Sequence, residues 1–143
     1  MEPIVVEFEV RASPQHAFDV WTTMPSLWWP RSHTVSQDPD LTVVFEPYPG
    51  GRIYEMTSDG SEHEWGEVLV WEPPLRLDYL WHLFFDRSEA TEIMVTFVET
   101  GEGSRVRLVQ TGFERLGEDV GPERRRRTSL AWAEVTGHYR DAV

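Results

Sequence analysis

The chain begins with an alternation of apolar and polar positions, a period of two that is typical of a strand with one buried face. Its apolar positions are Ile4, Val6, Phe8 and Val10. The period then changes at Ser13 and Pro14, which are suited to the N-cap and the first residue of a helix. We predict a short helix after them and a single helical turn over residues 26–29, because Pro25 and Pro30 interrupt the chain on either side.

Strand-like segments separated by turn residues fill the middle of the chain, and no helical period interrupts them. Turns are indicated by Gly50-Gly51 and Asp59-Gly60, and by Pro73-Pro74, which cannot continue a central strand. The predicted strands cover residues 41–46, 52–57, 62–71, 75–84, 91–99 and 104–111. Consecutive strands joined by short turns form an antiparallel meander.

After Gly112 one face of the chain repeats at steps of three and four, the period of an amphipathic helix. The positions on this face are Thr128, Ala131, Trp132, Val135, Tyr139 and Ala142. Pro122 can open this helix, which we predict to have about five or six turns. Its apolar stripe needs a concave partner, and the meander is the only element large enough to supply one. Because Gly137 costs ~1 kcal/mol relative to alanine, we expect close packing there.

Together these elements predict one α+β domain over residues 1–143. A curved antiparallel sheet of six to seven strands would wrap the long C-terminal helix, with two short helices after the first strand. A chain of 143 residues has the usual size of a single domain, and packing alone can stabilise it.

Composition excludes several classes of site. There is no cysteine, which excludes disulfides, thiolate metal sites and thiol nucleophiles. All 13 basic residues are arginine, so no lysine can form a Schiff base or hold a phosphate in a P-loop. The five histidines have no metal-ligand spacing, and no nucleophile elbow or dinucleotide fingerprint is present. We therefore predict no metal, no cofactor and no catalytic residue.

Charge narrows the choice of partners. The formal net charge of −12 repels phosphate backbones, so nucleic acid is not an expected partner. No apolar stretch approaches the ~20 residues that span a bilayer, and the N-terminus lacks the pattern of a signal peptide. We expect a cytoplasmic protein without membrane insertion, and the pattern leaves a homodimer open. Within the basic run 124–127, Arg124 and Arg127 either form surface salt bridges or border a cavity mouth and receive an anionic ligand group.

Five short strings occur in order along the chain. They are Gly50-Gly51-Arg52, Gly66-Glu67-Val68, Glu72-Pro73-Pro74-Leu75-Arg76-Leu77, Tyr79-Leu80-Trp81 and Thr111-Gly112-Phe113. In this order and spacing the whole chain resembles the SRPBCC superfamily, also called START or Bet v 1-like, and within it the family of the activator of Hsp90 ATPase homologue 1. The resemblance implies the helix-grip fold. It also implies an apolar cavity between helix and sheet that binds lipids, polyketides, hormones or similar molecules and in some members catalyses cyclisation or hydrolysis.

Seven tryptophans in so short a chain predict an interior rich in rings, which either fill the core or line a cavity. Strand alternation and the helical stripe bring a set of side chains around this interior, and we predict that they bind the ligand. The set is Trp21, Trp28, Tyr54, Met56, Trp65, Glu67, Tyr79, Trp81, Phe97, Trp132, Val135 and Tyr139.

Two of these assignments have an alternative. In the strand over residues 52–57, either Tyr54 and Met56 or Ile53 and Glu55 face inward. Glu67 shares the parity of the apolar residues in its strand, which carries it inward, where its carboxyl would have to be hydrogen-bonded or protonated. A bulge in the strand would turn Glu67 to solvent instead.

The predicted function is the binding of a small hydrophobic or aromatic molecule, without catalysis. One alternative is a polyketide cyclase or aromatase in which Glu67 or Tyr54 moves protons on a ligand in the same cavity. The other is a protein-interaction domain, similar to a co-chaperone, that uses the acidic exterior of the sheet.

Overall fold

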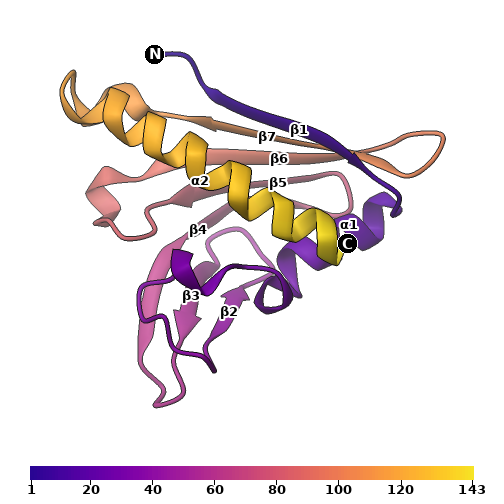
Figure 1. Ribbon diagram of the computed structural model, residues 1–143, viewed down its shortest axis with the longest axis horizontal. Helices are drawn as coiled ribbons and strands as arrows, with labels where there is room; N and C mark the ends of the chain where they lie inside the picture. Colours follow the sequence, from indigo (N-terminus) through magenta and orange to yellow (C-terminus); the bar gives the residue numbers. More distant parts are fainter.

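The computed structural model describes all 143 residues and shows a seven-stranded antiparallel sheet with one long helix lying across it (Figure 1). The strands are β1 (Ile4–Val10), β2 (Thr42–Phe45), β3 (Arg52–Met56), β4 (Glu62–Glu72), β5 (Arg76–Trp81), β6 (Thr91–Glu99) and β7 (Ser104–Thr111). The helices are α1 (Pro14–Thr22) and α2 (Val120–Ala142), with 3₁₀ turns at Pro25–Leu27, Arg31–His33, Arg87–Glu89 and Phe113–Leu116. The predicted α+β, helix-grip architecture is confirmed.

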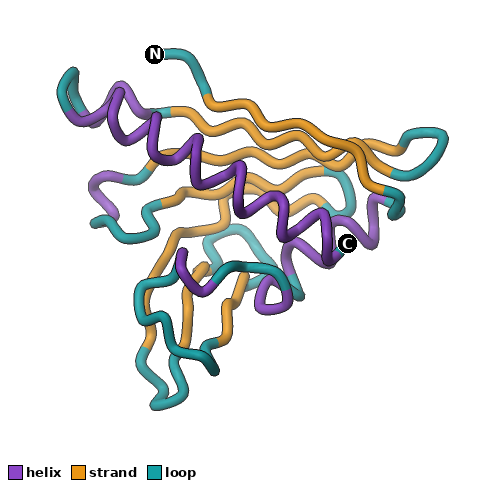
Figure 2. Tube along the Cα trace, viewed as in Figure 1, coloured by secondary structure: helices purple, strands orange, loops and turns teal.

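The sheet has the strand order β1-β7-β6-β5-β4-β3-β2. From β2 to β7 each strand pairs with the next along the chain, and β1 joins the sheet at the free edge of β7. Between α1 and β2 the chain follows a long loop with 3₁₀ turns, which lies at the end of the sheet formed by β2 and β3 (Figure 2). None of the helices combines the length and the apolar character that crossing a membrane requires.

The ends of the elements follow local chemistry. Ser13 caps α1 by accepting a hydrogen bond from the backbone N–H of His16 at 3.2 Å. Helix α2 begins at Val120, two residues before Pro122, which we predicted as its first residue. Pro122 therefore lies within the first turn, where proline is tolerated because the N–H groups have no helical partner. No atom would approach a Cβ at Gly137 within 4 Å, so the prediction of close packing at that glycine is wrong.

The predicted inner faces of β5, β6 and β7 are confirmed, because alternate residues on these strands are buried beneath α1 and α2. These residues are Leu77, Tyr79, Trp81, Ile93, Val95, Phe97, Val106 and Leu108. The strand predicted over residues 75–84 ends earlier, at Trp81. Residues 82–90 leave the sheet as a loop, in which Phe84 adopts a left-handed backbone with φ 74°, uncommon for a bulky side chain. We call residues 82–90 the β5–β6 loop.

Two register shifts in β4 change which residues face inward. The pairing with β3 shifts between Ile53 and Tyr54, opposite Trp65, and the pairing with β5 shifts between Val68 and Val70. A bulge adds one residue to a strand and reverses the alternation beyond it. Trp65 and Val68 are therefore both fully buried although they are three positions apart.

The bulges correct the prediction for Glu67. Glu67 pairs with Leu80, whose side chain lies on the opposite face of β5 from Tyr79 and Trp81, so Glu67 points away from the interior. Its carboxylate forms an ion pair with Arg87 at 3.0 Å, and 30% of its side chain is exposed. The alternative, in which a bulge turns Glu67 outward, holds.

Strand β3 also takes the alternative orientation. Ile53 and Glu55 are fully buried, whereas Met56 is 37% exposed and Tyr54 is half-buried beneath the guanidinium of Arg52, 4.3 Å from its ring. The placement of Tyr54 and Met56 in the interior is therefore wrong. Each face of β3 carries one apolar residue, Ile53 on one and Met56 on the other, so the local pattern did not distinguish the two faces.

Candidate ligand-binding cavity

A cavity of about 560 Å³ lies between the first half of α2, the β5–β6 loop and the neighbouring ends of β5, β6 and β7. Its apolar wall consists mainly of Trp29, Trp81, Leu83, Phe113, Trp132 and Val135. This volume is within the range of small-molecule sites, which also combine apolar and polar side chains, and half of the 20 lining residues here are hydrophobic.

The predicted site residues fall into three groups. Trp81, Trp132 and Val135 line the cavity. Most of the other predicted residues are buried in the packed core beside it and do not line it; they are Trp21, Trp28, Trp65, Tyr79, Phe97 and Tyr139. Glu67, Tyr54 and Met56 lie outside the interior, as described above. Both alternatives for the tryptophans thus hold in part, because some rings fill the core and others border a void.

The filled part of the interior is an aromatic cluster around Trp21. Its ring centroid lies 4.9 Å from that of Tyr139 and 5.2 Å from that of Trp28. The Tyr139 hydroxyl donates to the carbonyl of Ala17 at 2.7 Å, which joins α2 to α1. Burial raises the pKa of Tyr139 and of Tyr79 above the ordinary tyrosine range, so both phenols stay protonated at neutral pH.

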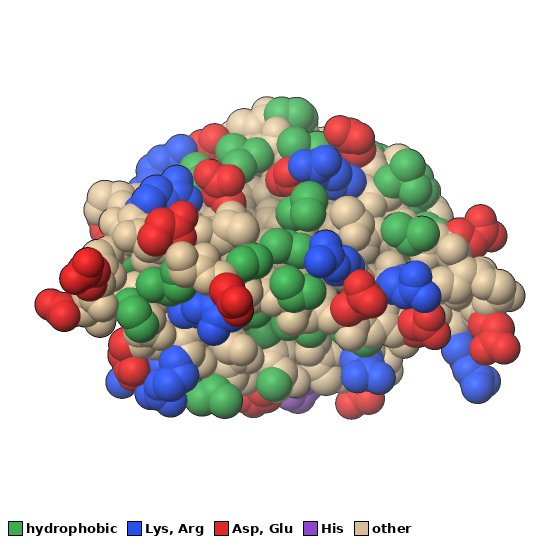
Figure 3. All heavy atoms as spheres, turned by 90° about the horizontal axis from the view of Figure 1, so that it is seen from above, with side chains coloured by type: hydrophobic (Ala, Val, Ile, Leu, Met, Phe, Trp, Pro, Cys, Tyr) green, Lys and Arg blue, Asp and Glu red, His purple; other side chains and the backbone are tan.

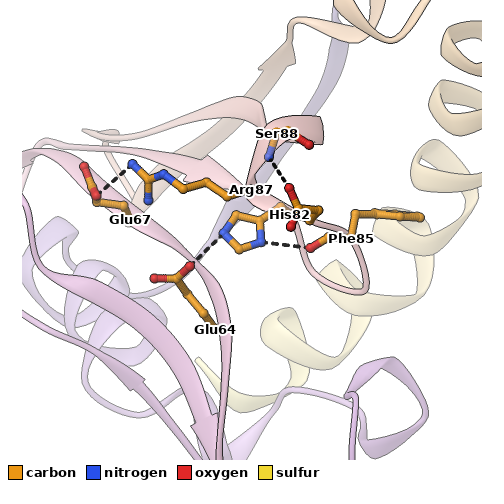
Figure 4. Close-up of polar contacts among 7 residues, drawn as sticks. Glu64, Glu67, His82, Phe85, Arg87 and Ser88 are labelled. Atoms are coloured by element: carbon orange, nitrogen blue, oxygen red, sulfur yellow. Dashed lines mark hydrogen bonds and ion pairs between the residues drawn. The ribbon is translucent and has the colours of Figure 1, made fainter.

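The β5–β6 loop forms one wall of the cavity and is held at several points (Figure 4). His82 is buried, with Nδ1 3.1 Å from the carbonyl of Phe85 and Nε2 3.3 Å from a carboxylate oxygen of Glu64. Farther along, Arg87 reaches Glu67, and the side chain of Asp86 accepts from the backbone of Ser88 at 2.9 Å. The contacts with Glu64 and Glu67 fix the loop to the outer side of β4, and the Asp86–Ser88 bond holds the loop itself.

Arg124 fixes the same loop to α2. Its guanidinium lies 2.9 Å from the carboxylate of Glu89 and 3.3 Å from the centroid of the Phe85 ring. Only 15% of the Arg124 side chain is exposed. Arg124 and Arg127 both border the cavity, as one of the sequence alternatives had it. Each nevertheless has an acidic partner, since Arg127 lies 3.1 Å from Glu123.

Two polar arrangements face the cavity. At its inner end Trp132 donates to Gln110 at 2.7 Å, and Gln110 donates to Thr91 at 2.8 Å. The second arrangement involves the segment between α1 and β2, residues 23–41, which we call the α1–β2 segment. Nε2 of His33 in this segment lies 2.9 Å from the carboxylate of Glu134. The hydrogen bond from His33 is the largest of the influences that hold the pKa of Glu134 below its ordinary value.

The buried carboxylate that the sequence assigned to Glu67 belongs to Glu55. Its two oxygens accept from the backbone N–H groups of Val35 and Ser36, from the Ser36 hydroxyl and from the indole of Trp65, at 2.6–3.0 Å. Burial alone would raise the pKa of Glu55, but the hydrogen bonds from Ser36, Val35 and Trp65 outweigh it and hold the pKa below its ordinary value. Glu55 is therefore an ionised anchor of the α1–β2 segment and does not border the cavity.

Sequence reasoning missed several cavity residues. Trp29 follows Trp28 directly in the sequence, and such a tryptophan pair is rare. Which of the two rings borders a cavity, however, depends on tertiary packing. His33, Thr91 and Gln110 carried no signal, because their partners are distant in the chain: His33 and Glu134 are 101 residues apart. No group of three or more His, Asp or Glu side chains is arranged to hold a metal ion.

A family model described as Activator of Hsp90 ATPase homolog 1-like protein matches residues 11–136. The chain belongs to this family. No curated protein matches it.

Solved structures extend the comparison. Protein MLL2253 from Mesorhizobium loti is 19% identical with a TM-score of 0.72, and the match covers 98% of this chain and 95% of that one. An AHSA1-like protein from Aeromonas hydrophila is 15% identical with a TM-score of 0.66, covering 97% and 90%. These two show the shared fold. Txn09, described as an anthrahydroquino-γ-pyrone synthase complexed with SUM, is 33% identical with a TM-score of 0.67, covering 100% of this chain and 97% of that one.

Proposed function

We propose that this AHSA1-like protein binds a flat, largely apolar aromatic molecule in the cavity between α2 and the β5–β6 loop. The observation that carries the proposal is an open volume of about 560 Å³ bordered by the indoles of Trp29, Trp81 and Trp132, next to a cluster of buried apolar side chains. Flat walls of this kind favour a flat ligand, because rings stack and meet edge to face at close range.

The apolar surface that a ligand would bury in the cavity is large enough to give a favourable binding free energy. A three-ring ligand that buries roughly 200 Å² of apolar surface gains about 5 kcal/mol at about 25 cal/mol per Å², before ordering costs. The 33% identity to Txn09 over the whole chain supports the same chemical class, since that protein is described as a synthase of a fused aromatic product. We propose no protein-interaction role, because acidic and basic side chains are interspersed on the face seen in Figure 3. Elsewhere too acidic groups are paired, since Arg105 and Arg107 lie 4.0 and 3.3 Å from the carboxylate of Glu7.

A titration with 1,8-dihydroxyanthraquinone tests the proposal. The dye absorbs light in the region of tryptophan emission, so binding beside Trp81 and Trp132 should quench the protein's fluorescence with saturation at one equivalent. Equilibrium dialysis of the same samples provides a stoichiometry that does not depend on fluorescence. A linear loss of emission equal to that of free tryptophan amide, with no retention in dialysis, would contradict the proposal.

The His33–Glu134 pair favours a second candidate, ring closure on the bound molecule. Because Nε2 of His33 donates to the carboxylate of Glu134, Nδ1 is the ring nitrogen that carries the lone pair in the neutral form of the imidazole. Nδ1 could accept the proton of a phenol while the phenol oxygen adds to a neighbouring ketone carbon. Return of that proton to the former ketone oxygen, followed by loss of water, leaves a γ-pyrone ring.

The simplest compound with this reactivity is 1-(2-hydroxyphenyl)butane-1,3-dione, which closes to 2-methylchromone and water. We expect the wild-type protein to accelerate the closure, His33→Ala to abolish the acceleration, and Glu134→Gln to reduce kcat and shift the pH profile while KM changes little. His63→Ala, at a position outside the cavity lining, is the matched control. A wild-type rate equal to the buffer rate would reject ring closure and leave the binding proposal to be judged by the dye titration.

A further inference from the structure

Three buried polar side chains interrupt the apolar wall of the cavity. Thr91 at the start of β6, Gln110 near the end of β7 and Trp132 on α2 border the void and are 4%, 1% and 2% exposed. The indole of Trp132 donates to Oε1 of Gln110 at 2.7 Å, and Nε2 of Gln110 donates to Oγ1 of Thr91 at 2.8 Å. We call these three residues the Gln110 relay.

The indole fixes the orientation of the amide. An indole N–H can only donate, so the group of Gln110 that faces Trp132 must be the carbonyl oxygen. The NH₂ group of Gln110 then faces Thr91, and the Thr91 oxygen must accept from it. The indole of Trp132 therefore determines which group donates and which accepts in both hydrogen bonds of the relay.

This arrangement leaves one donor hydrogen unused and another with only a long hydrogen bond. The NH₂ group of Gln110 has two hydrogens, and its bond to Thr91 uses one. The Thr91 hydroxyl must direct its own hydrogen elsewhere, and the nearest acceptor is the carbonyl of Trp81 at 3.4 Å, beyond the ordinary length of an O–H···O bond. A buried donor with a weak acceptor or none is unfavourable, and here the second amide hydrogen of Gln110 and the weakly bonded Thr91 hydroxyl belong to residues that line an open volume.

We propose that this cavity selects aromatic ligands that carry a carbonyl oxygen, which accepts hydrogen bonds from the Gln110 amide and the Thr91 hydroxyl. Aromatic ketones and quinones are the class that fits, because a carbonyl oxygen has two lone pairs and lies in the plane of the ring system. A ligand group that could only donate would meet two donors. This inference rests on the proposed binding function and adds the polar group that the ligand must present.

A purely structural role for the relay would be to hold Trp132 in place, and the experiment must separate the two roles. Fluorene and 9-fluorenone have the same three fused rings and differ by one carbonyl group. Their affinities for each protein are measured by equilibrium dialysis, and the ratio of the two is compared between variants. The comparison between variants cancels the difference in how the two compounds are solvated in water.

The variants are Thr91→Val, which removes the hydroxyl but keeps the shape, and Gln110→Met, which removes the amide. The control is Thr136→Val, because Thr136 is also buried and its hydroxyl donates to the carbonyl of Trp132, but it does not line the cavity. We expect the affinity ratio of fluorenone to fluorene to fall about three- to tenfold in both relay variants, the factor typical of one neutral hydrogen bond, and to stay constant in the control. Fluorene affinity should change less than twofold throughout.

The other outcomes are decisive. If both compounds bind and the ratio is unchanged in Thr91→Val and Gln110→Met, the relay is structural and the inference is wrong. A ratio that falls equally in Thr136→Val would also overturn it, since loosened packing would then explain the loss. If neither compound binds wild type, the binding function itself fails. Should Gln110→Met not fold, as judged by circular dichroism, Thr91→Val decides alone.

Discussion

The indole N–H of Trp65 donates to the carboxylate of Glu55 across 2.9 Å, and both side chains are completely buried. Because Val35 and Ser36 supply the other donors, this carboxylate connects β3 and β4 to the α1–β2 segment. That segment also carries two residues of the cavity wall. The Glu55 cluster therefore supports the cavity from outside, without touching a ligand.

Replacing the Glu55 carboxylate by an amide should destabilise the fold. In Glu55→Gln the NH₂ group would face donors that now have a charged acceptor, so we expect a loss of about 2–3 kcal/mol in the free energy of unfolding, measured in urea. Glu62→Gln is the matched control, because Glu62 pairs with Arg52 at 2.9 Å on the surface with 41% of its side chain exposed. It should change stability by less than about 0.5 kcal/mol. Equal losses in the two variants would show that Glu55 is no more important than a surface group.

The same carboxylate predicts a dependence of stability on pH. The pKa of Glu55 is lower in the folded protein than in the unfolded chain, so its contribution is fully present above the ordinary glutamate pKa of about 4.3 and is lost as the pH falls through the lower folded pKa. The difference in unfolding free energy between wild type and Glu55→Gln should therefore be largest above about pH 5 and shrink in more acidic buffer. A difference that grows on acidification would mean that the folded protein holds Glu55 protonated.

Filling the cavity should abolish ligand binding without unfolding the protein. Ala131 borders the void, whereas its neighbour Leu130 is 63% exposed, so Ala131→Trp places an indole in the ligand's volume and Leu130→Trp places one in solvent. We expect at least a tenfold loss of affinity for 1,8-dihydroxyanthraquinone in Ala131→Trp and less than a twofold change in Leu130→Trp, both by equilibrium dialysis. Unchanged binding in Ala131→Trp would place the dye elsewhere on the protein.

Removing the cation that joins α2 to the β5–β6 loop should loosen the loop. Arg124→Gln eliminates both the ion pair with Glu89 and the contact with the Phe85 ring, so amides of residues 83–90 should exchange with deuterium about three- to tenfold faster. Arg126→Gln is the control, because Arg126 is 60% exposed and pairs only with Glu123. If exchange in the loop is the same in all three proteins, the anchors on β4 suffice to hold it.

The strands and the main helix could be predicted from the sequence because their signals are local. Alternation identified β1 and the inner faces of β5 to β7, and the three-and-four spacing identified the buried stripe of α2, which includes Trp132, Val135 and Tyr139. Each of these elements has one buried face, so burial imposes its period directly on the residues.

The errors occur where geometry between strands overrides a local period. The sequence of β4 does not indicate that its pairing register shifts beside Trp65 and again near Val68. Those shifts turn Glu67 outward. Similarly, Tyr54 and Ile53 compete for the same face of a strand, and the acceptor role of Glu55 toward Ser36 decided between them.

What the sequence determined by itself is the order of the elements, their buried faces and an interior rich in indoles. Which indoles pack together around Trp21 and which border the cavity beside Trp132 follows from the packing of the whole chain, because a void depends on how well distant segments fit and not on any one of them. The polar groups of the cavity have the same origin. Gln110 and His33 acquire their partners from α2, so their chemistry exists only once the helix lies across the sheet.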